Sequence, residues 1–335
     1  MTFMHIGKDF VPPDVEGKVT GDAKYVEDFK PEGLVYARLL TSPMPSGRVR
    51  SIDASEALRM DGVLGILTAD DLPPSTAPAE PVLASEDVTF VGQPILAVAA
   101  ISDEIAENAI DRIKVDFDHR PFVTDPLESL IEGGPDAYPD GNVLQQTNSL
   151  EDENATIRGG FGTIKWPAEE LGRFRNGLEP RGVQFADGWT YGDLDAAFSE
   201  SEIIVEESFV VAGTPHHCME PRSSMAYWQN GKCYFYASTQ SQSAVVEPLA
   251  ELLGIEPENV CMISENTGGG FGSKGRVYPT MAITGRFSQL LNRPVQLRIT
   301  REEEYYLGVG RPGMQGLSLI HISEPTRRTP ISYAV

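Results

Sequence analysis

The first third of the chain alternates between strand-like and helix-like patterns of apolar residues. Residues 94–100 are apolar throughout, which is typical of a strand buried on both faces of a sheet. Residues 106–113 instead keep apolar side chains at helical spacing, and residues 113–117 alternate like a half-buried strand. Two further strands and one short helix are expected here, at 34–40, 63–68 and 52–60. The pattern predicts one mixed α/β unit over residues 17–126, after a lead-in of residues 1–16.

A second α/β pattern covers residues 191–316. Strands are predicted at 203–211, 234–237, 260–264 and 295–300, and helices at 194–198, 244–253 and 281–291. Asp193 is suited to cap the first of these helices, and Gly254 to end the second. The segment between the two units, residues 127–190, is rich in turn residues and predicts a long wrapping linker. Its Gly-Gly-Phe-Gly sequence at 159–162 lacks a flanking strand and helix, so we expect a flexible turn there.

A glycine-rich turn separates the strand at 260–264 from the helix at 281–291. Four of its five consecutive positions are glycines, namely Gly268, Gly269, Gly270 and Gly272. Without side chains the backbone can approach a bound group closely, and the amides of such a turn suit an anion such as a phosphate. The loop therefore predicts a site for an anionic cofactor, with a tight ligand-free turn as the alternative.

The same loop fits a dinucleotide-binding fingerprint through Gly270, Gly272 and Gly275, with Glu302 as the acidic residue expected further on. An NAD-type dehydrogenase is therefore one hypothesis for the function. The kinase pattern is excluded because the chain has neither a His-Arg-Asp nor an Asp-Phe-Gly sequence. A Walker loop is excluded because serine, not glycine, precedes the lysine of the loop.

Charge and cysteine content narrow the partners that this chain can have. The 335-residue chain has a formal net charge of −22, which argues against nucleic acid or an anionic membrane as a partner. No apolar run approaches about eighteen residues, so no membrane span is predicted. The 3 cysteines include no Cys-x-x-Cys pair, so neither an iron–sulfur cluster nor a structural zinc is expected here. The sparse cysteines fit a reducing compartment, and the expected location is the cytoplasm.

One group of neighbouring residues offers metal-ligand types: His216, His217, Cys218 and Glu220. Adjacent histidines in an extended chain point to opposite faces, which makes a shared metal site unfavourable. We therefore favour structural hydrogen bonding for this group over the binding of a metal ion.

Five sequence segments, taken in order, resemble the large, molybdenum-binding subunit of the xanthine dehydrogenase and aldehyde oxidase family. They lie at 19–28, 92–94, 219–222, 238–240 and 267–274. The resemblance covers about residues 14–316 and rests on the ordered succession of these motifs. It implies an α+β (mixed α/β) fold, with an a/b hammerhead domain at 17–126 and a truncated first molybdopterin-binding domain at 191–316.

The resemblance further implies a molybdenum hydroxylase. In this family water supplies the oxygen that enters a C–H bond of the substrate, and electrons leave through iron–sulfur clusters. Those clusters and FAD would belong to an iron–sulfur subunit and an FAD subunit, because neither group is expected in this chain. The cofactor would be molybdenum bound to molybdopterin, with the cytosine dinucleotide form as one candidate.

The family's motifs also assign site residues to this sequence. Gln240 resembles the glutamine whose side chain reaches the oxo ligand of the metal, and Phe271 lies in the loop expected beside the metal and its pterin. The cofactor-binding set is Gln240, Gly269, Gly270, Phe271 and Gly272, with Gln240 and Phe271 nearest molybdenum. No catalytic residue is expected within this sequence, because the family's general-base glutamate lies beyond the position that corresponds to residue 316.

One departure from the family pattern bears on the substrate. Purine oxidisers of this family carry a substrate-binding glutamate directly after the lysine of the loop, where this chain has Gly275. The expected substrate is therefore an aldehyde or another N-heterocycle. Without the base glutamate the chain alone is expected to be inactive, and a non-catalytic binding subunit is the remaining alternative.

The last residues differ in character from everything before them. Residues 317–327 resemble the translation of a transposase adapter used in short-read sequencing libraries. Residues 331–335 resemble the translation of the flow-cell primer that follows it. We therefore expect residues 317–335 to be non-native and the sequence to be a gene fragment.

Overall fold

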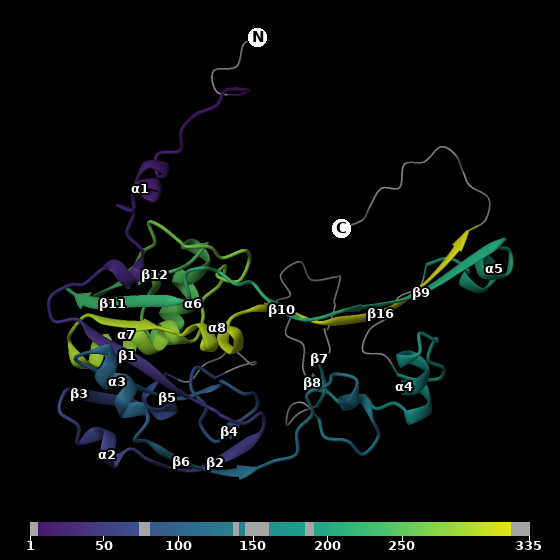
Figure 1. The fold of residues 1–335 in the computed structure, drawn as a ribbon, viewed down its shortest axis with the longest axis horizontal. Coiled ribbons are helices and arrows are strands. Elements are labelled where there is room, and N and C mark those ends of the chain that lie inside the picture. The colour runs from purple at the N-terminus through teal and green to yellow at the C-terminus, as the bar shows by residue number, and fades with distance from the viewer. Residues whose placement is uncertain (1–5, 74–80, 137–140, 145–160, 185–190, 323–335) are drawn as a thin grey trace. The chain divides into compact units, whose positions relative to one another are not determined.

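The structure is a computed structural model that describes residues 6–73, 81–136, 141–144, 161–184 and 191–322. The chain divides into two compact units (Figure 1). The first unit consists of Met1–His119 with Pro215–Gly310, and the second of Arg120–Thr214 with Arg311–Val335. Among the residues that the structure describes, no helix is long and apolar enough to cross a membrane.

A seven-stranded sheet forms the centre of the first unit, in the order β13-β12-β11-β14-β1-β5-β3. Its strands are β1 (Val35–Thr41), β3 (Val63–Leu67), β5 (Pro94–Ala100), β11 (Ser223–Gln229), β12 (Lys232–Ala237), β13 (Val260–Ile263) and β14 (Val295–Arg298). Parallel pairing of β1 with β14 sets Val35 opposite Val295. One continuous sheet therefore joins strands from both predicted α/β segments of the sequence.

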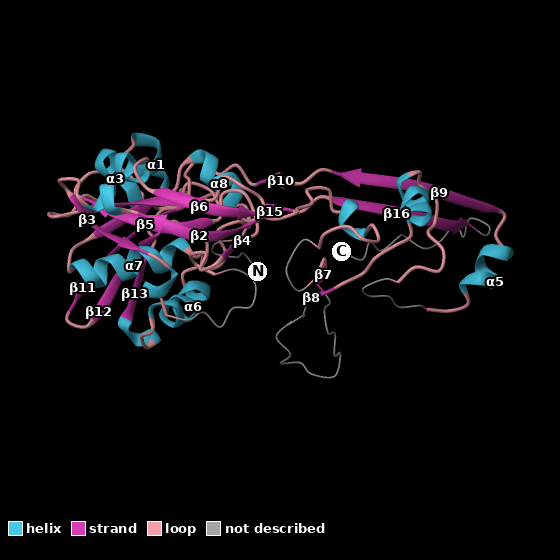
Figure 2. Cartoon of the chain, turned by 90° about the horizontal axis from the view of Figure 1, so that it is seen from below, coloured by secondary structure: helices cyan, strands magenta, loops and turns pink. Residues whose placement is uncertain are grey.

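Helices cover both faces of this sheet (Figure 2). The largest are α3 (Asp103–Ile110), α6 (Ser243–Leu253) and α7 (Thr280–Leu291). On β5, Leu96 and Val98 belong to an apolar cluster with residues of α3. Ala97 and Ala99 point the other way and pack in a cluster with Phe287 of α7. This two-sided burial explains why the strand is apolar at every position.

The first unit also contains a smaller sheet, short helices and 3₁₀ turns. A three-stranded sheet has the order β4-β2-β6. Its strands are β2 (Gly47–Asp53), β4 (Asp87–Val88) and β6 (Lys114–His119), and the short helices are α1 (Val15–Thr20), α2 (Ser55–Leu58) and α8 (Arg301–Leu307). Single 3₁₀ turns occur at η1 (Val26–Asp28), η2 (Ala69–Asp71) and η4 (Pro257–Asn259). Strands β10 (Thr214–Pro215) and β15 (Gly310–Arg311), which span the boundaries of the two units in the sequence, are two residues long, like β4.

The second unit contains a long antiparallel ribbon of β9 (Ile203–Val211) and β16 (Met314–Ile322). Val211 pairs with Met314 at one end, and Ile203 pairs with Ile322 at the other. The unit also holds a short hairpin, two helices and one 3₁₀ turn: β7 (Val143–Leu144), β8 (Phe161–Gly162), α4 (Ala168–Arg175), α5 (Leu194–Ser199) and η3 (Glu128–Leu130). Its apolar cluster is small and is built on Ile164, Trp166 and Leu171.

Most of the predicted strands and helices are confirmed within one to three residues at each end. The caps are confirmed as well. The Asp193 carboxylate accepts the Ala196 N–H at 2.9 Å at the start of α5. Gly254 adopts a left-handed conformation, with φ 66°, at the end of α6. The apolar pattern and the cap residues thus located most of the strands and helices.

Three predictions of local structure are wrong. The helix expected at 52–60 is limited to α2, because β2 extends to Asp53, whose carboxylate accepts the Ser55 N–H. The segment 127–190 contains the helix α4, which buries Leu171 against the cluster around Trp166. Within the Gly-Gly-Phe-Gly sequence, residues 161–162 form β8 rather than a turn, and residues 159–160 lie outside the described residues.

Strand β16 runs through the position where the non-native tail is predicted to begin. Met314 and Gln315 pair with β9 in the same register as Leu319 and Ile320. Residues 323–335 lie outside the part of the chain that the structure describes. The origin of residues 317–335 therefore stays a prediction.

Candidate functional site

The glycine loop lies between the end of β13 and the start of α7, as predicted. Three positions of its backbone adopt positive φ angles: 97° at Gly269, 51° at Phe271 and 100° at Gly272. A positive φ is uncommon for a residue with a side chain and marks a locally strained backbone. The Phe271 side chain is 64% exposed. The loop therefore holds an aromatic ring in the open on a constrained backbone.

Gln240, which follows the end of β12, lies directly against this loop. Its side-chain oxygen Oε1 accepts the amide N–H groups of Gly272 at 3.0 Å and Lys274 at 3.2 Å. Its backbone N–H donates to the Lys274 carbonyl at 2.9 Å. A Cβ atom on Gly270 would lie 2.2 Å from Gln240 Cδ, so this close approach requires glycine. The structure thus brings together all five residues of the predicted cofactor-binding set.

The loop and Gln240 retain hydrogen-bond donors for a bound group. Because Oε1 of Gln240 accepts two amides, Nε2 is the free end of its side chain, and it has no partner among the described residues. The amides of Gly269 and Gly270 likewise have no acceptor within the described part of the chain. These donors, together with the exposed Phe271 ring, fit a flat anionic cofactor lying against the loop.

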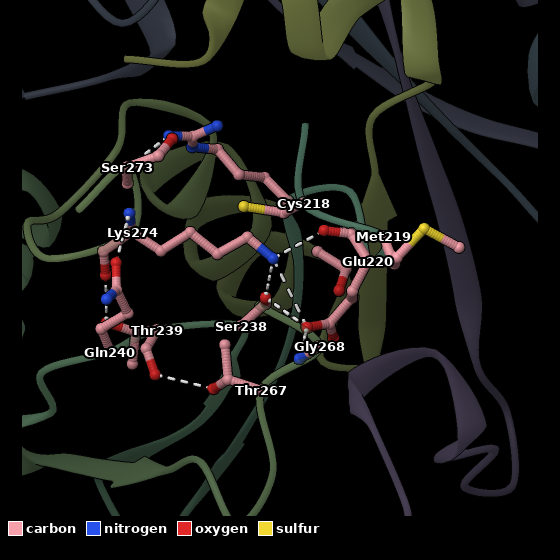
Figure 3. Close-up of polar contacts among 12 residues, drawn as sticks. Cys218, Met219, Glu220, Ser238, Thr239, Gln240, Thr267, Gly268, Ser273 and Lys274 are labelled. Carbon is pink, nitrogen blue, oxygen red and sulfur yellow. Dashed lines mark hydrogen bonds and ion pairs between the residues drawn. The ribbon is translucent and has the colours of Figure 1, made fainter. Parts of the chain in front are cut away.

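A buried ion pair joins the two ends of the loop, and the sequence patterns did not predict it (Figure 3). The Lys274 ammonium donates to the Glu220 carbonyl at 2.7 Å and to Ser238 Oγ, and lies 3.4 Å from Glu220 Oε2. The same carboxylate oxygen accepts the Gly268 N–H and the Ser238 hydroxyl, each at 2.7 Å. Burial lowers the pKa of Lys274, and the Glu220 carboxylate acts in the opposite direction. We call this group, Glu220, Ser238, Gly268 and Lys274, the loop lock.

A second buried ion pair, between Arg222 and Glu304, holds the loop at Ser273. Arg222 pairs with Glu304 of α8, and its backbone N–H donates to Glu304 Oε2 at 2.8 Å. The guanidinium also donates to the carbonyl and the hydroxyl of Ser273 in the loop. It lies over the ring of Tyr278 at 5.5 Å, and burial raises the pKa of that phenol. Arg222 therefore ties the loop to α8.

The helix α8 carries a sequence signal that could have been read in advance. Thr300 and Glu303 form a capping box at its start, and the Thr300 hydroxyl accepts the Glu303 N–H at 3.1 Å. This Thr-x-x-Glu spacing marks a helix beginning at Arg301 and therefore locates Glu304.

The two adjacent histidines have different partners, although the chain is not extended here as the prediction assumed, because His217 has a φ of 52°. His216 Nδ1 lies 2.7 Å from the carbonyl oxygen of Val309, whereas His217 Nδ1 lies 3.3 Å from the hydroxyl of Tyr305. Cys218 is buried. Across the described residues, no group of three or more His, Cys, Asp or Glu side chains is placed to hold a metal ion.

The fold does not support the dinucleotide fingerprint at this loop. That motif needs a strand–helix–strand unit with neighbouring parallel strands. Here β13 and β14, on either side of the loop and α7, are separated in the sheet by β12 and β11. Glu302 is exposed in the first turn of α8 rather than at the end of β14. The NAD-type dehydrogenase hypothesis therefore lacks its structural context.

Two family models match the sequence. The aldehyde oxidase and xanthine dehydrogenase a/b hammerhead domain matches residues 20–121. The molybdopterin cofactor-binding domain matches residues 178–317, which include the whole loop, Gln240 and the loop lock. The two predicted domain types are thus confirmed in the predicted order.

Curated relatives and solved structures agree with these models. The chain is 28% identical to a probable xanthine dehydrogenase subunit of Bacillus subtilis (strain 168), covering 91% of this chain and 36% of that protein. It is also 28% identical to "Nicotine 6-hydroxylase large subunit" of Paenarthrobacter nicotinovorans, covering 90% and 34%. Aldehyde oxidoreductase from Desulfovibrio gigas has the same fold, with a TM-score of 0.73 at 22% identity, over 92% of this chain and 32% of that one. The chain spans about a third of the length of these proteins.

Proposed function

Because this chain belongs to the xanthine dehydrogenase and aldehyde oxidase family of molybdenum oxidoreductases, we propose that it is the cofactor-binding part of a molybdenum hydroxylase. The complete enzyme would insert water-derived oxygen into a C–H bond of an aldehyde or an N-heterocycle. When bound, molybdenum–molybdopterin would supply the two-electron redox chemistry of that reaction. The cytosine dinucleotide form is the form that we propose.

The hydrogen bonds of Gln240 carry this proposal. Its Oε1 is held by the amides of Gly272 and Lys274, which leaves Nε2 as a donor without a partner among the described residues. We assign that donor to an acceptor oxygen of the cofactor. The free amides of Gly269 and Gly270 would hold a second acceptor, and the Phe271 ring would lie against the flat face of the bound group.

The open space at Gly275 supports the substrate class. A Cβ atom there would meet only the Gly272 carbonyl oxygen, at 3.9 Å, so no side chain fills the position after the lysine. A purine would find no carboxylate at this position. Aldehydes and other N-heterocycles place no such demand on it, and one relative is named for the hydroxylation of nicotine.

Electron transfer would require partner subunits. The relatives include proteins named as a large subunit and as subunit gamma of a dehydrogenase complex. We propose an iron–sulfur subunit and an FAD subunit as partners of the complete protein, and a general-base glutamate in the part of the relatives that this chain does not cover. The chain alone would then bind cofactor without turnover.

The cofactor assignment is tested by producing the chain in a host that makes the molybdenum cofactor. We expect molybdenum and pterin to co-purify with the chain, measured by mass spectrometry of the metal and by pterin fluorescence. Gln240→Glu keeps an acceptor for both loop amides but removes the donor, and should lower cofactor content about tenfold. Gln289→Glu is the matched control, because Gln289 is exposed on α7 and its side-chain oxygen accepts from Arg286 at 2.7 Å, so this change also keeps an acceptor and removes a donor.

Two outcomes would contradict the proposal. A folded wild-type chain without bound pterin would contradict the cofactor assignment. Substrate-dependent reduction of a dye by the chain alone, with an aldehyde or an N-heterocycle, would contradict its proposed inactivity.

A further inference from the structure

His216 lies beside the glycine loop and is assigned no role by the family motifs. Its Nε2 atom is 3.7 Å from the position that a Cβ atom on Gly272 would occupy. Gly272 is the residue whose amide donates to Gln240 Oε1. Two polar side chains from different parts of the chain therefore meet at the same glycine.

The other ring nitrogen of His216 is fixed by the backbone. Nδ1 lies 2.7 Å from the carbonyl oxygen of Val309, which can only accept a hydrogen bond. Nδ1 therefore carries the proton and donates it to Val309. In the neutral ring Nε2 is then the unprotonated nitrogen and acts as a hydrogen-bond acceptor.

No described residue satisfies this acceptor. His216 Nε2 has no hydrogen-bond partner among the residues that the structure describes, and the ring is only partly buried. An imidazole oriented by a carbonyl on one nitrogen, with the other nitrogen free beside an open loop, is the arrangement of a ligand-binding histidine.

The neighbouring His217 shows that this arrangement is specific to His216. His217 has a positive φ of 52°, and its ring packs edge-on against Tyr305 at 5.3 Å. It thus lies against α8, whereas its neighbour faces the loop. The backbone turn at His217 separates the two rings, so that of the two histidines only His216 lies beside Gly272.

We propose that His216 Nε2 accepts a hydrogen bond from a ring N–H of a heterocycle bound against the glycine loop. This inference rests on the proposed function and deepens it, because it gives the loop a recognition group for nitrogen heterocycles. The heterocycle is either the pterin of the cofactor or an N-heterocyclic substrate, since both present ring N–H donors. Gln240 would contact the bound group from the other side of Gly272.

The inference is tested on the chain itself by nitrogen NMR of labelled histidines, with pterin and 2-pyridone as separate probes. In the free chain we expect the Nδ1–H form of His216. One of the probes should shift the Nε2 resonance: pterin if the cofactor is the partner, 2-pyridone alone if the substrate is. An Nε2–H form in the free chain, or no shift with either probe, would overturn the inference.

Two substitutions separate recognition from folding. His216→Asn keeps a donor at the Nδ1 position for Val309 but removes Nε2, and should weaken binding of the effective probe about tenfold. His216→Gln places an amide oxygen, which is a hydrogen-bond acceptor, near the Nε2 position. Its affinity for the probe should stay within about threefold of wild type. His217→Asn is the control and should leave binding unchanged. Equal binding of the probe by wild type and His216→Asn would overturn this inference but not the proposed function. The proposed function would be contradicted if the purified wild-type chain contained no molybdenum and no pterin.

Discussion

The loop lock in the first unit and the ribbon in the second unit use opposite means of holding a backbone. In the loop lock a fully buried lysine and a carboxylate that is 9% exposed share five polar contacts around one glycine turn. In the ribbon, backbone pairing runs unbroken while apolar side chains stay open, with Val210 74% exposed and Phe209 56% exposed. A backbone segment that is held by buried charges is sensitive to substitution of either charged residue. A backbone segment that is held by strand pairing alone tolerates almost any side chain.

The largest effect in this comparison is expected from removing the buried ammonium. Lys274→Met leaves Glu220 without its counter-charge in a dry environment, which should lower the free energy of unfolding by about 3–5 kcal/mol. Chemical denaturation of the two proteins measures the loss. Lys114→Met is the matched control, because Lys114 pairs with Glu56 at 3.4 Å on the surface. That change should cost less than about 1 kcal/mol.

A double substitution sharpens this result. Lys274→Met with Glu220→Gln removes both charges and should recover part of the loss. A loss under about 1 kcal/mol for Lys274→Met alone would show that the ion pair does not hold the loop.

A smaller effect is expected from adding one methyl group to the loop. Gly270→Ala places Cβ 2.2 Å from Gln240 Cδ, so the side chain of Gln240 must leave its two amides. We expect a loss of about 1–3 kcal/mol and faster hydrogen exchange at Gly272 and Lys274. Gly65→Ala in β3 is the control, since its Cβ would meet nothing within 4 Å. Hydrogen-exchange protection at Gly272 that is unchanged by Gly270→Ala would contradict the role of Gln240 in holding these two amides.

The pH dependence of the loop lock has a defined sign. Burial lowers the pKa of Lys274 from 10.5, while Glu220 acts the other way. Between the lowered folded pKa and 10.5 the unfolded chain binds the extra proton, so stability gains as the pH rises through this window. The gain has a slope of at most about 1.4 kcal/mol per pH unit.

The effect is isolated as a difference between wild type and Lys274→Met. Burial raises the pKa of Tyr278 and raises that of Cys233 to about 12, so both groups lower stability at high pH in both proteins. Subtracting the two unfolding free energies from about pH 8 to about pH 10 removes these contributions. A difference that shrinks with rising pH would contradict the assignment to Lys274.

The sequence predicted the elements that have a local pattern or motif, but it did not predict the buried ion pair of the loop lock. Periodicity located β5 and α7 because each buries a long apolar face. The motif order brought Gln240 and Phe271 to one loop, and the geometry agrees. The partnership of Glu220 with Lys274 joins residues far apart in the sequence and leaves no spacing signal. β11 was missed because its buried Ser223 and Ser224 interrupt the apolar pattern.

The smallest effect is expected where the ribbon is changed. Ending the chain after Gly316 removes Leu317 to Ile322, and with them most of the pairs between β16 and β9. No residue of the loop lock takes part in that pairing, since all of its members lie within Pro215–Gly310. We therefore expect hydrogen exchange of Gly268 and Lys274 to remain unchanged, while the protection of β9 is lost. Loosening of the loop lock by this truncation would mean that backbone pairing and buried charge are one cooperative structure, and the contrast between the two regions would fail.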